Sequence, residues 1–118
     1  ISIAPRYQRM GYGALLLRHS MDEAGKCGAG ALAITGSIGF YGKSGFVTAS
    51  TKGIHYFAEP RTEEVPYFLI KELEPGFLDG ITGVYRDPEG YFLDEAEAEK
   101  FDAQFPPKEK QKLPGQLA

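Results

Sequence analysis

The segment Gln8 to Gly13 (Gln-Arg-Met-Gly-Tyr-Gly) has residue types and a spacing that can bind an anion through backbone groups. Glycines at positions 11 and 13 carry no Cβ, so the backbone can approach phosphate oxygens and take turn angles closed to other residues. The segment opens a predicted helix, whose first N–H groups and positive dipole end attract negative charge. Arg9 can add charge-assisted hydrogen bonds. The pattern predicts a pyrophosphate site, although the turn alone fits a tight strand-to-helix connection equally well.

A second block lies downstream, where Phe40 to Phe46 reads Phe-Tyr-Gly-Lys-Ser-Gly-Phe. Together with Ile3 to Leu16, it resembles two signatures of the GCN5-related N-acetyltransferase (GNAT) superfamily, in the family's order. The family patterns are Gln/Arg-x-x-Gly-x-Gly/Ala between a strand and a helix, then Phe-Tyr-x-Lys-x-Gly-Phe. The resemblance covers Ile1 to Phe46, and the run Pro75 to Gly83 is similar to the carboxyl-terminal part of one bacterial-type branch. The implied fold class is α/β, the carboxyl-terminal portion of the GNAT acyl-CoA N-acyltransferase fold, with a mixed sheet and helices on both faces.

The resemblance implies acetyl-CoA (CoA) as cosubstrate and assigns its contacts. The pantetheine arm would lie along the backbone of the strand end Ile1 to Ala4, while the amides of Met10 to Ala14 would bind the pyrophosphate. Ser37 and Phe40 would line the pantetheine or thioester end. Many family members carry Asn where this chain has Ser37, and a hydroxyl offers fewer donors than an amide, which leaves the role of Ser37 open. The implied cofactor-binding residues are Ile3, Arg9, Met10, Gly11, Tyr12, Gly13, Ala14, Ser37 and Phe40.

The reaction that the resemblance implies is direct attack of a neutral amine on the acetyl thioester, without a covalent enzyme intermediate. Backbone N–H groups can stabilise the resulting oxyanion. Tyr41 aligns with the family position whose phenol protonates the departing thiolate, a task that suits a group with a pKa of roughly 10. The alternative is that Tyr41 and Phe40 only pack a short helix on the sheet. The general base and the small-molecule or peptide amine acceptor stay unassigned, because the family elements that usually shape the amine pocket would precede Ile1.

Three other reactive side chains have simpler interpretations. His19 falls inside the predicted helix without further ligands at metal spacing, so no metal is implied. His55 lies among aromatic residues in a predicted loop, where it either borders the substrate pocket as a base or binding group, or packs in the loop. Cys27 is interpreted as a small apolar residue rather than a nucleophile, because thioester transfer in this family is direct.

The elements that must position these residues follow from periodicity and from capping signals. Apolar residues three and four positions apart predict the first helix, which Gly28 ends. Short apolar runs predict strands, and Asp94 is a favourable N-cap. In chain order, the predicted elements are a strand end at 1–4, a helix at 12–27, a parallel strand buried on both faces at 31–35, a helix at 38–44 capped by Ser37 and ended by Gly45, strands at 46–49, 65–73 and 81–85, and a helix at 95–104. Residues 50–64 are predicted to be a loop, and residues 106–118 an extended tail.

Composition excludes several classes of protein. The chain has 118 residues, a net charge of -3 and a pI near 5.4. These values do not indicate the clustered basic face of a nucleic-acid binder. A single cysteine fits a reducing compartment, which makes the cytoplasm the default location. No apolar run approaches the roughly 20 residues of a membrane span. Because the chain begins at Ile1 within a strand-like run, we expect a truncated or incomplete chain.

We expect residues 1–93 to form the acetyltransferase domain and residues 94–118 to form a helix and tail. The leading hypothesis for function is an acetyl-CoA-dependent N-acetyltransferase that acts on an unidentified amine, with a homodimer as one form of assembly. The alternatives are a CoA-binding regulatory module and an inactive truncated fragment that needs another chain to complete its fold. Exposed edge backbone at residues 1–4 would favour such an association.

Overall fold

The computed structural model describes residues 1–60 and 64–112. Residue contacts divide the chain into two compact units, Ile1–Tyr85 and Arg86–Ala118. The predicted domain boundary after residue 93 stays a prediction. Within the described ranges, no helix combines the length and the apolar character that crossing a membrane requires.

Helix α1 (Tyr12–Lys26) forms where the apolar periodicity predicts it. Leu17 on its inner side is buried, and Met21 packs against the same cluster one turn later. Lys26 lies in the last turn, where a cation suits the negative end of the helix dipole. Gly28 then takes a φ of 88°, a conformation that favours glycine, so the helix ends as predicted.

The main sheet has three strands in the order β1 (Ala31–Thr35), β4 (Phe68–Glu72) and β2 (Val47–Thr48). Both pairings are antiparallel, and Ala33 and Val47 flank Ile70 in the register. β1 and β2 therefore run parallel to each other with β4 between them. The prediction that residues 31–35 pair in parallel is wrong. β1 and β2 do not pair with each other, because β4, which comes later in the chain, lies between them and pairs antiparallel with both.

β4 is the strand that is buried on both faces. Leu69 packs with Leu17 and Phe46 on one face, while Phe68 and Ile70 join a second cluster on the other, as the alternation of side chains along a strand requires. β1 is only half-buried. The burial on both faces that was expected for residues 31–35 therefore belongs to β4 instead.

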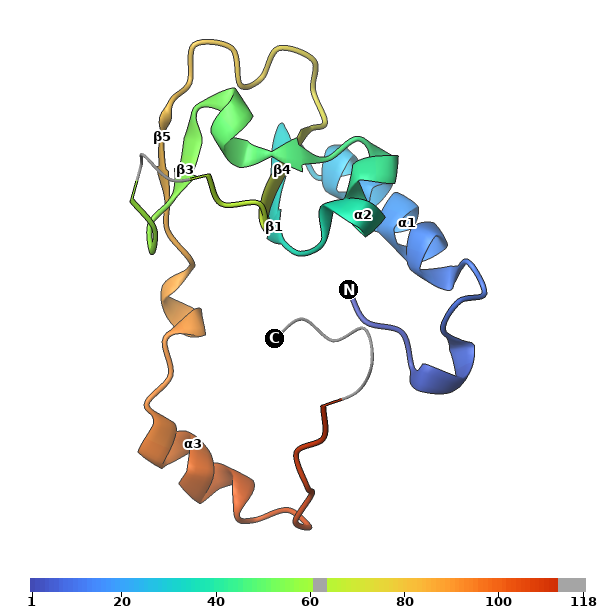
Figure 1. The fold of residues 1–118 in the computed structure, drawn as a ribbon, viewed down its shortest axis with the longest axis vertical. Coiled ribbons are helices and arrows are strands. Elements are labelled where there is room, and N and C mark those ends of the chain that lie inside the picture. Colours follow the sequence, from blue (N-terminus) through green and yellow to red (C-terminus); the bar gives the residue numbers. More distant parts are fainter. Residues whose placement is uncertain (61–63, 113–118) are drawn as a thin grey trace. The chain divides into compact units, whose positions relative to one another are not determined.

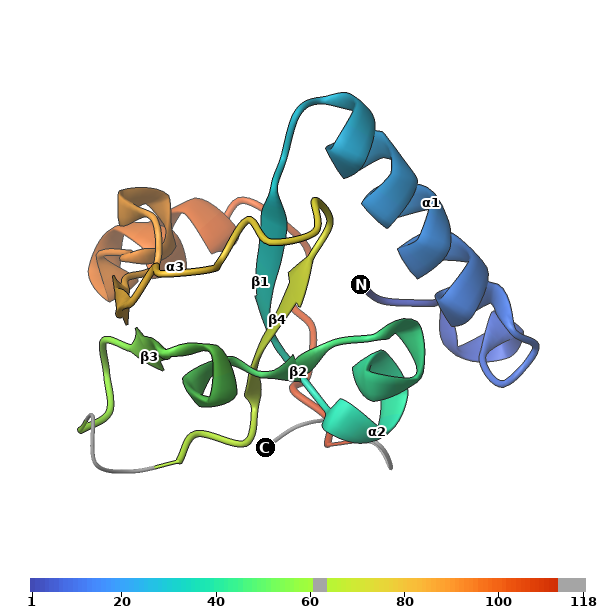
Figure 2. The same cartoon turned by 90° about the horizontal axis from the view of Figure 1, so that it is seen from above.

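Helices α1 and α2 (Ile38–Tyr41) lie on one side of β4, whereas β3 (Ile54–Tyr56) lies on the other (Figure 1 and Figure 2). On the face of β4 where β3 lies, the cover consists of a 3-10 helix at Ala49–Lys52 and of β3, which pairs in parallel with β5 (Gly83–Tyr85). In the described residues, short strands and a 3-10 helix thus take the place of the α-helix expected on that face. The architecture is mixed α/β, as predicted.

Several elements of the structure differ from the secondary structure predicted for the same residues. Residues 1–4 form no strand, because no described strand runs beside them to complete a ladder. The chain instead enters a 3-10 turn at Pro5–Tyr7, in which the Tyr7 N–H donates to the Ala4 carbonyl at 2.8 Å. The predicted helix at 38–44 is α2 followed by a 3-10 turn at Gly42–Ser44, and Gly45 ends it with a φ of 93°. The predicted loop at 50–64 contains β3, which is too short to show a period in sequence.

In the unit that begins at Arg86, a 3-10 turn at Glu89–Tyr91 precedes helix α3 (Glu95–Asp102). Asp94 caps this helix as predicted, because its carboxylate accepts from the Glu97 N–H at 3.0 Å. Residues 106–112 are exposed and contain no helix or strand, in agreement with the predicted tail. Residues 61–63 of the predicted loop and residues 113–118 of the predicted tail lie outside the described residues.

Glu72 at the end of β4 holds the turn that follows it. Its Oε2 accepts from the Leu78 N–H at 3.1 Å, and its Oε1 lies 3.5 Å from Lys52 Nζ. The Leu78 N–H lowers the pKa of this carboxyl below its ordinary value of 4.5; Lys52 and the Gly76 N–H also lower it, while desolvation opposes the shift. Lys52 is 46% exposed, so its ion pair with Glu72 is screened by solvent. The hydrogen bond from the Leu78 N–H should therefore stabilise the Glu72 carboxylate more than the ion pair does.

We expect Glu72→Gln to lower the melting temperature near neutral pH by an amount that shrinks as the solution becomes acidic. Because the folded pKa lies below the unfolded one, the carboxylate stabilises the fold above pH 4.5, and this stabilisation is lost as the pH falls through the folded pKa. Thermal unfolding followed by circular dichroism across this range measures the effect. Glu74→Gln, at an exposed neighbouring carboxylate, is the control, and a difference for Glu72→Gln that does not vary with pH would contradict the assignment.

Candidate functional site

Residues 8–13, the predicted pyrophosphate site, form a turn that leads into the N-terminus of α1. This segment is named the phosphate loop. Gly11 is the N-cap residue with a φ of 85°, and Arg9 also takes a positive φ of 61°. A non-glycine residue in this region is uncommon and is found in turns and at functional sites. The first hydrogen bond of the helix joins the Leu15 N–H to the Gly11 carbonyl at 3.2 Å, and no described side chain caps the helix. The N–H groups at the start of α1 are therefore open to an anion.

Gln8 has a role that the sequence does not reveal. Its Nε2 donates to the Ile3 carbonyl at 2.8 Å, across the 3-10 turn at Pro5–Tyr7. The bond fixes the start of the chain against the phosphate loop. Ile3 is the predicted backbone contact for the pantetheine arm, and its carbonyl keeps a second lone pair for a ligand. The glutamine of the motif is visible in the sequence, but the backbone group that it reaches is not.

The structure brings the two sequence motifs into contact. A Cβ at position 13 would lie 3.2 Å from Cζ of Phe40 and 3.9 Å from Cγ1 of Ile3. The first turn of α1 is thus flanked by an aromatic ring and by an aliphatic side chain. Three of the predicted cofactor-binding residues, Ile3, Gly13 and Phe40, converge here. The absence of a Cβ at position 13 lets the Phe40 ring lie close to the backbone of α1.

Tyr41 is fixed by contacts of its ring. The ring meets those of Phe40 and Phe46 edge to face, with centroid distances of 4.8 Å and 5.5 Å. A Cβ on Gly36 would lie 2.5 Å from Cε2 of Tyr41, so any larger residue there would displace the ring. Tyr41 is half-buried, and within the described residues its hydroxyl makes no hydrogen bond. The ring therefore packs, while the hydroxyl stays available to a ligand.

The remaining predicted contacts lie at the surface. Met10, Tyr12 and Ala14 are exposed along the loop and the first turn of α1. Ser37 is exposed at the N-cap position of α2, but its side chain does not cap the helix. Its carbonyl accepts instead from the N–H groups of Phe40 and Tyr41, at 3.2 Å and 3.0 Å. The predicted capping role of the Ser37 hydroxyl is therefore wrong, and the hydroxyl is left for another partner.

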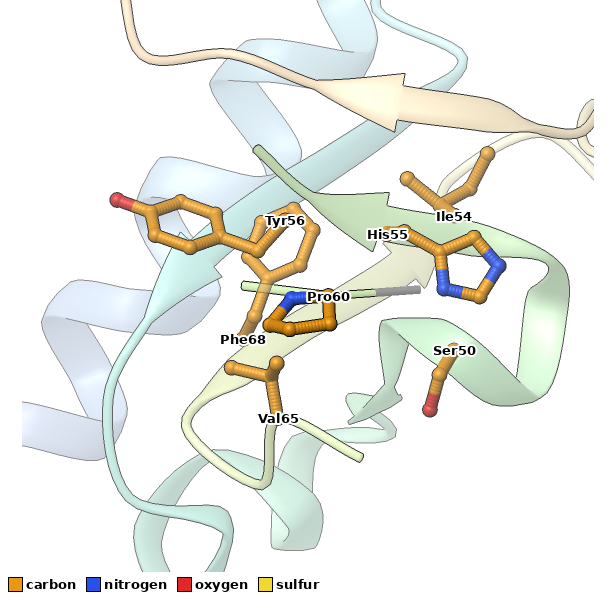
Figure 3. A pocket seen from close by; sticks show the side chains of 7 residues that line it. All are labelled: Ser50, Ile54, His55, Tyr56, Pro60, Val65 and Phe68. Carbon is orange, nitrogen blue, oxygen red and sulfur yellow. The ribbon is translucent and has the colours of Figure 1, made fainter. Parts of the chain in front are cut away.

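His55 lines a small cavity on the face of the sheet that carries Phe68, as Figure 3 shows. The cavity volume is about 10 Å³, which has room for one water molecule and not for an amine substrate. Tyr41 packs with Leu69 on the opposite face. Of the two interpretations of His55, the structure favours packing over a role as base. The residues that line the cavity are Ser50, Ile54, His55, Tyr56, Pro60, Val65 and Phe68.

The other reactive residues do not gather into a site. His19 and Cys27 are both exposed on or beside α1. Within residues 1–60 and 64–112, no three His, Cys, Asp or Glu side chains lie close enough together to hold a metal ion. Neither His19 nor Cys27 therefore belongs to a metal-binding cluster of the described residues.

Comparisons with known proteins agree with this geometry. Residues 1–46 match the family model described as the Acetyltransferase (GNAT) family. Among solved structures, the chain is similar to a GNAT family N-acetyltransferase (YhbS) from Escherichia coli in complex with CoA, with a TM-score of 0.67 and 20% sequence identity. The similarity covers 76% of this chain and 48% of that one, so the chain spans about half the length of that enzyme. A search among curated proteins finds no match.

These findings confirm the resemblance on which the sequence interpretation rests. The family match covers both motifs, from the strand-like start through Phe46. The structural similarity shows that the fold of this chain matches about half of the fold of that enzyme. The individual contacts and the role of Tyr41 are not tested by either comparison and stay predictions.

Proposed function

We propose, from a segment 1–46 that matches the GNAT family and a fold shared with a GNAT N-acetyltransferase, that this chain forms the acetyl-CoA-binding and carboxyl-terminal part of an N-acetyltransferase. The observation that carries the proposal is the convergence at Gly13, in the first turn of a helix without a side-chain cap, where the Cβ position lies close to Phe40 and Ile3. This arrangement combines an anion site with an apolar wall. Such a combination suits a pyrophosphate joined to an extended pantetheine arm.

In this proposal, the chain's own groups bind and orient the cosubstrate. The backbone N–H groups of Met10 to Ala14 hold the pyrophosphate, and Arg9 adds a charge-assisted hydrogen bond. The Ile3 carbonyl contacts the pantetheine arm, while Ser37 and Phe40 line its thioester end. Acetyl-CoA supplies the activated acetyl group for direct attack by a neutral amine. No metal takes part in this scheme.

Tyr41 is the proposed general acid. Its ring packs against those of Phe40 and Phe46, and its hydroxyl makes no hydrogen bond with the described residues. A phenol O–H is a proton donor, and it can give its proton to the leaving sulfur atom. Gly36 supports this role, because the absence of a Cβ there lets the ring lie close to the backbone.

The acceptor, the compartment and the assembly are proposed from the sequence. The acceptor is a small-molecule or peptide amine rather than nucleic acid, in line with a net charge of -3. The single cysteine suits the cytoplasm, and no membrane partner is proposed. The proposed form of self-association is a homodimer.

Isothermal titration calorimetry with CoA and acetyl-CoA tests the proposal. We expect saturable binding with dissociation constants between roughly 1 μM and 1 mM, the usual range of enzyme KM values. Assays of acetyl transfer to a panel of amines then separate an enzyme from a module that only binds CoA. Analytical ultracentrifugation identifies a chain that needs another chain to complete its fold. A folded, monodisperse chain that binds neither ligand would overturn the proposal.

A further inference from the structure

The unit that begins at Arg86 exposes large apolar side chains. Residues 88–112 are exposed throughout, and among them Leu93 is 72%, Phe101 62% and Phe105 53% exposed. Helix α3 has only eight residues, and an isolated helix shorter than about 12 residues is marginal in water. Its apolar side chains therefore need a partner surface to cover them.

These side chains share one side of the helix, which is named the α3 face and consists of Leu93, Ala98, Phe101 and Phe105. The last three follow one another at steps of three and four residues, the spacing that aligns side chains along a helix. The helical winding continues to Phe105, because its N–H donates to the Asp102 carbonyl at 3.0 Å. The rings of Phe101 and Phe105 are in contact, with centroids 5.3 Å apart.

An open hollow lies along the α3 face. Its volume is about 630 Å³. One water molecule takes roughly 30 Å³, so the hollow has room for side chains of a second helix. Leu93, Ala98 and Phe101 form its apolar lining, and the carboxylates around it include those of Asp94 and Glu97. The hollow thus suits an apolar side chain that is flanked by cations.

The sign of the charge changes along this segment. Four carboxylates stand at the start of α3, at positions 94, 95, 97 and 99, whereas the residues after Phe105 include Lys108, Lys110 and Lys112, with Glu109 between them. Within the described part of the chain, these two groups form no ion pair. The segment therefore carries an apolar knob, the hollow that suits it, and two groups of opposite charge at its two ends.

The two groups meet across a pair of antiparallel helices. Pro106 and Pro107 fix φ near −65° and favour an extended course, so the lysines lead away from the α3 that they follow. In an antiparallel pair, the lysines of each copy run beside the acidic start of the other copy's helix. A parallel pair would set like charges against each other, which is unfavourable.

We propose that α3 is a self-association surface, through which two copies of the chain pair antiparallel. Phe105 of each copy enters the hollow between Leu93 and Phe101 of the other, and the lysines flank the acidic helix start. A two-fold interface of this kind makes every contact twice. The inference goes beyond the proposed acetyl-CoA function and names the surface of the proposed homodimer.

Sedimentation velocity of the whole chain, over a range of protein and salt concentrations, tests the pairing. We expect a monomer–dimer equilibrium with a micromolar dissociation constant, because two short helices lie at the small end of protein interfaces. Raising the salt from roughly 0.05 M to 0.5 M should weaken the dimer several-fold, since exposed charges are then screened. A chain that stays monomeric up to about 1 mM would overturn the proposal.

Phe101→Gln tests the apolar contact. It should raise the dissociation constant of the dimer at least about tenfold, because two rings lose their burial at once. Leu15→Gln is the matched control, since Leu15 is an apolar residue on α1 with a similar exposure of 59%. The control should dimerise like the parent. Equal weakening by both substitutions would show that the α3 face is not the interface.

Two charge-reversed variants test the antiparallel arrangement. The first carries Lys108→Glu with Lys110→Glu, and the second carries Glu95→Lys with Glu97→Lys. Each alone should raise the dissociation constant at least about fivefold at low salt, the scale of several exposed ion pairs. An equimolar mixture of the two restores every opposite pair and should associate like the parent. Parent-like dimers of each variant alone, or a mixture that associates much more tightly than the parent, would contradict antiparallel pairing.

The interface and the proposed function can fail separately. The candidate CoA site lies in the unit Ile1–Tyr85, whereas α3 lies in the other unit. Phe101→Gln should therefore bind CoA like the parent in titration calorimetry. A parent that dimerises without binding CoA would overturn the proposed function alone, and a monomeric parent that binds CoA would overturn only the α3 interface.

Discussion

Gly11→Val should abolish detectable binding of CoA while leaving the chain folded. Gly11 is the N-cap residue of α1 at a φ of 85°, a conformation that a β-branched residue strongly disfavours. A Cβ at this position lies more than 4 Å from the surrounding side chains and from the backbone of other elements, so the added Cβ itself causes no clash with them. The expected loss comes from the altered turn and from a side chain standing where a phosphate must approach the N–H groups.

Gly28→Val is the matched control for this experiment. Gly28 follows the other end of the same helix at a φ of 88°, and a Cβ there also meets nothing within 4 Å. Each variant should lose about 1–2 kcal/mol of stability, the cost of a left-handed conformation for a residue other than glycine. Thermal unfolding measures that loss, and titration calorimetry measures CoA binding. Parent-like affinity in Gly11→Val, or equal loss of affinity in both variants, would contradict the phosphate site.

The predictable parts of the fold are those with a strong local signal. Helix α1 has an apolar period that places Leu17 and Met21 on one side, together with a glycine that can end it. Asp94 and the start of α3 are equally local, because an N-cap bond spans only three residues. The position of β4 between β1 and β2 is not local. It depends on long-range pairing, which a short apolar run cannot specify.

The candidate site divides in the same way. The glycine turn and the block around Tyr41 can be recognised as motifs, since each lies within a few residues of sequence. Their contact through Gly13 and Phe40 depends on how α1 and α2 pack on the sheet. The bond from Gln8 to Ile3 depends on the 3-10 turn that replaces the predicted strand end. Sequence therefore predicts which residues to test, whereas the structure explains why a residue without a Cβ suits positions 13 and 36.

Tyr41→Phe should lower kcat about 10²- to 10⁴-fold with little change in acetyl-CoA affinity, the range expected when a general acid is removed. The substitution deletes only the hydroxyl, so the edge-to-face contacts with Phe40 and Phe46 remain. Steady-state kinetics on a good amine acceptor, with calorimetry for the cosubstrate, measures both quantities. The protein assayed must complete the acceptor site, whether this chain alone does so or together with further elements.

Tyr67→Phe is the control, because it removes the hydroxyl of a tyrosine that has no proposed role in catalysis. Tyr67 Oη donates to Glu59 Oε1 at 3.1 Å, and burial, with a smaller contribution from Glu59, raises its pKa above the ordinary value. Its removal should leave kcat unchanged. If Tyr41→Phe retains kcat within about threefold of the parent, short of the range for a general acid, then Tyr41 is a packing residue. The thiolate would in that case leave unprotonated or take its proton from water, and the proposed CoA site would survive without a phenolic acid.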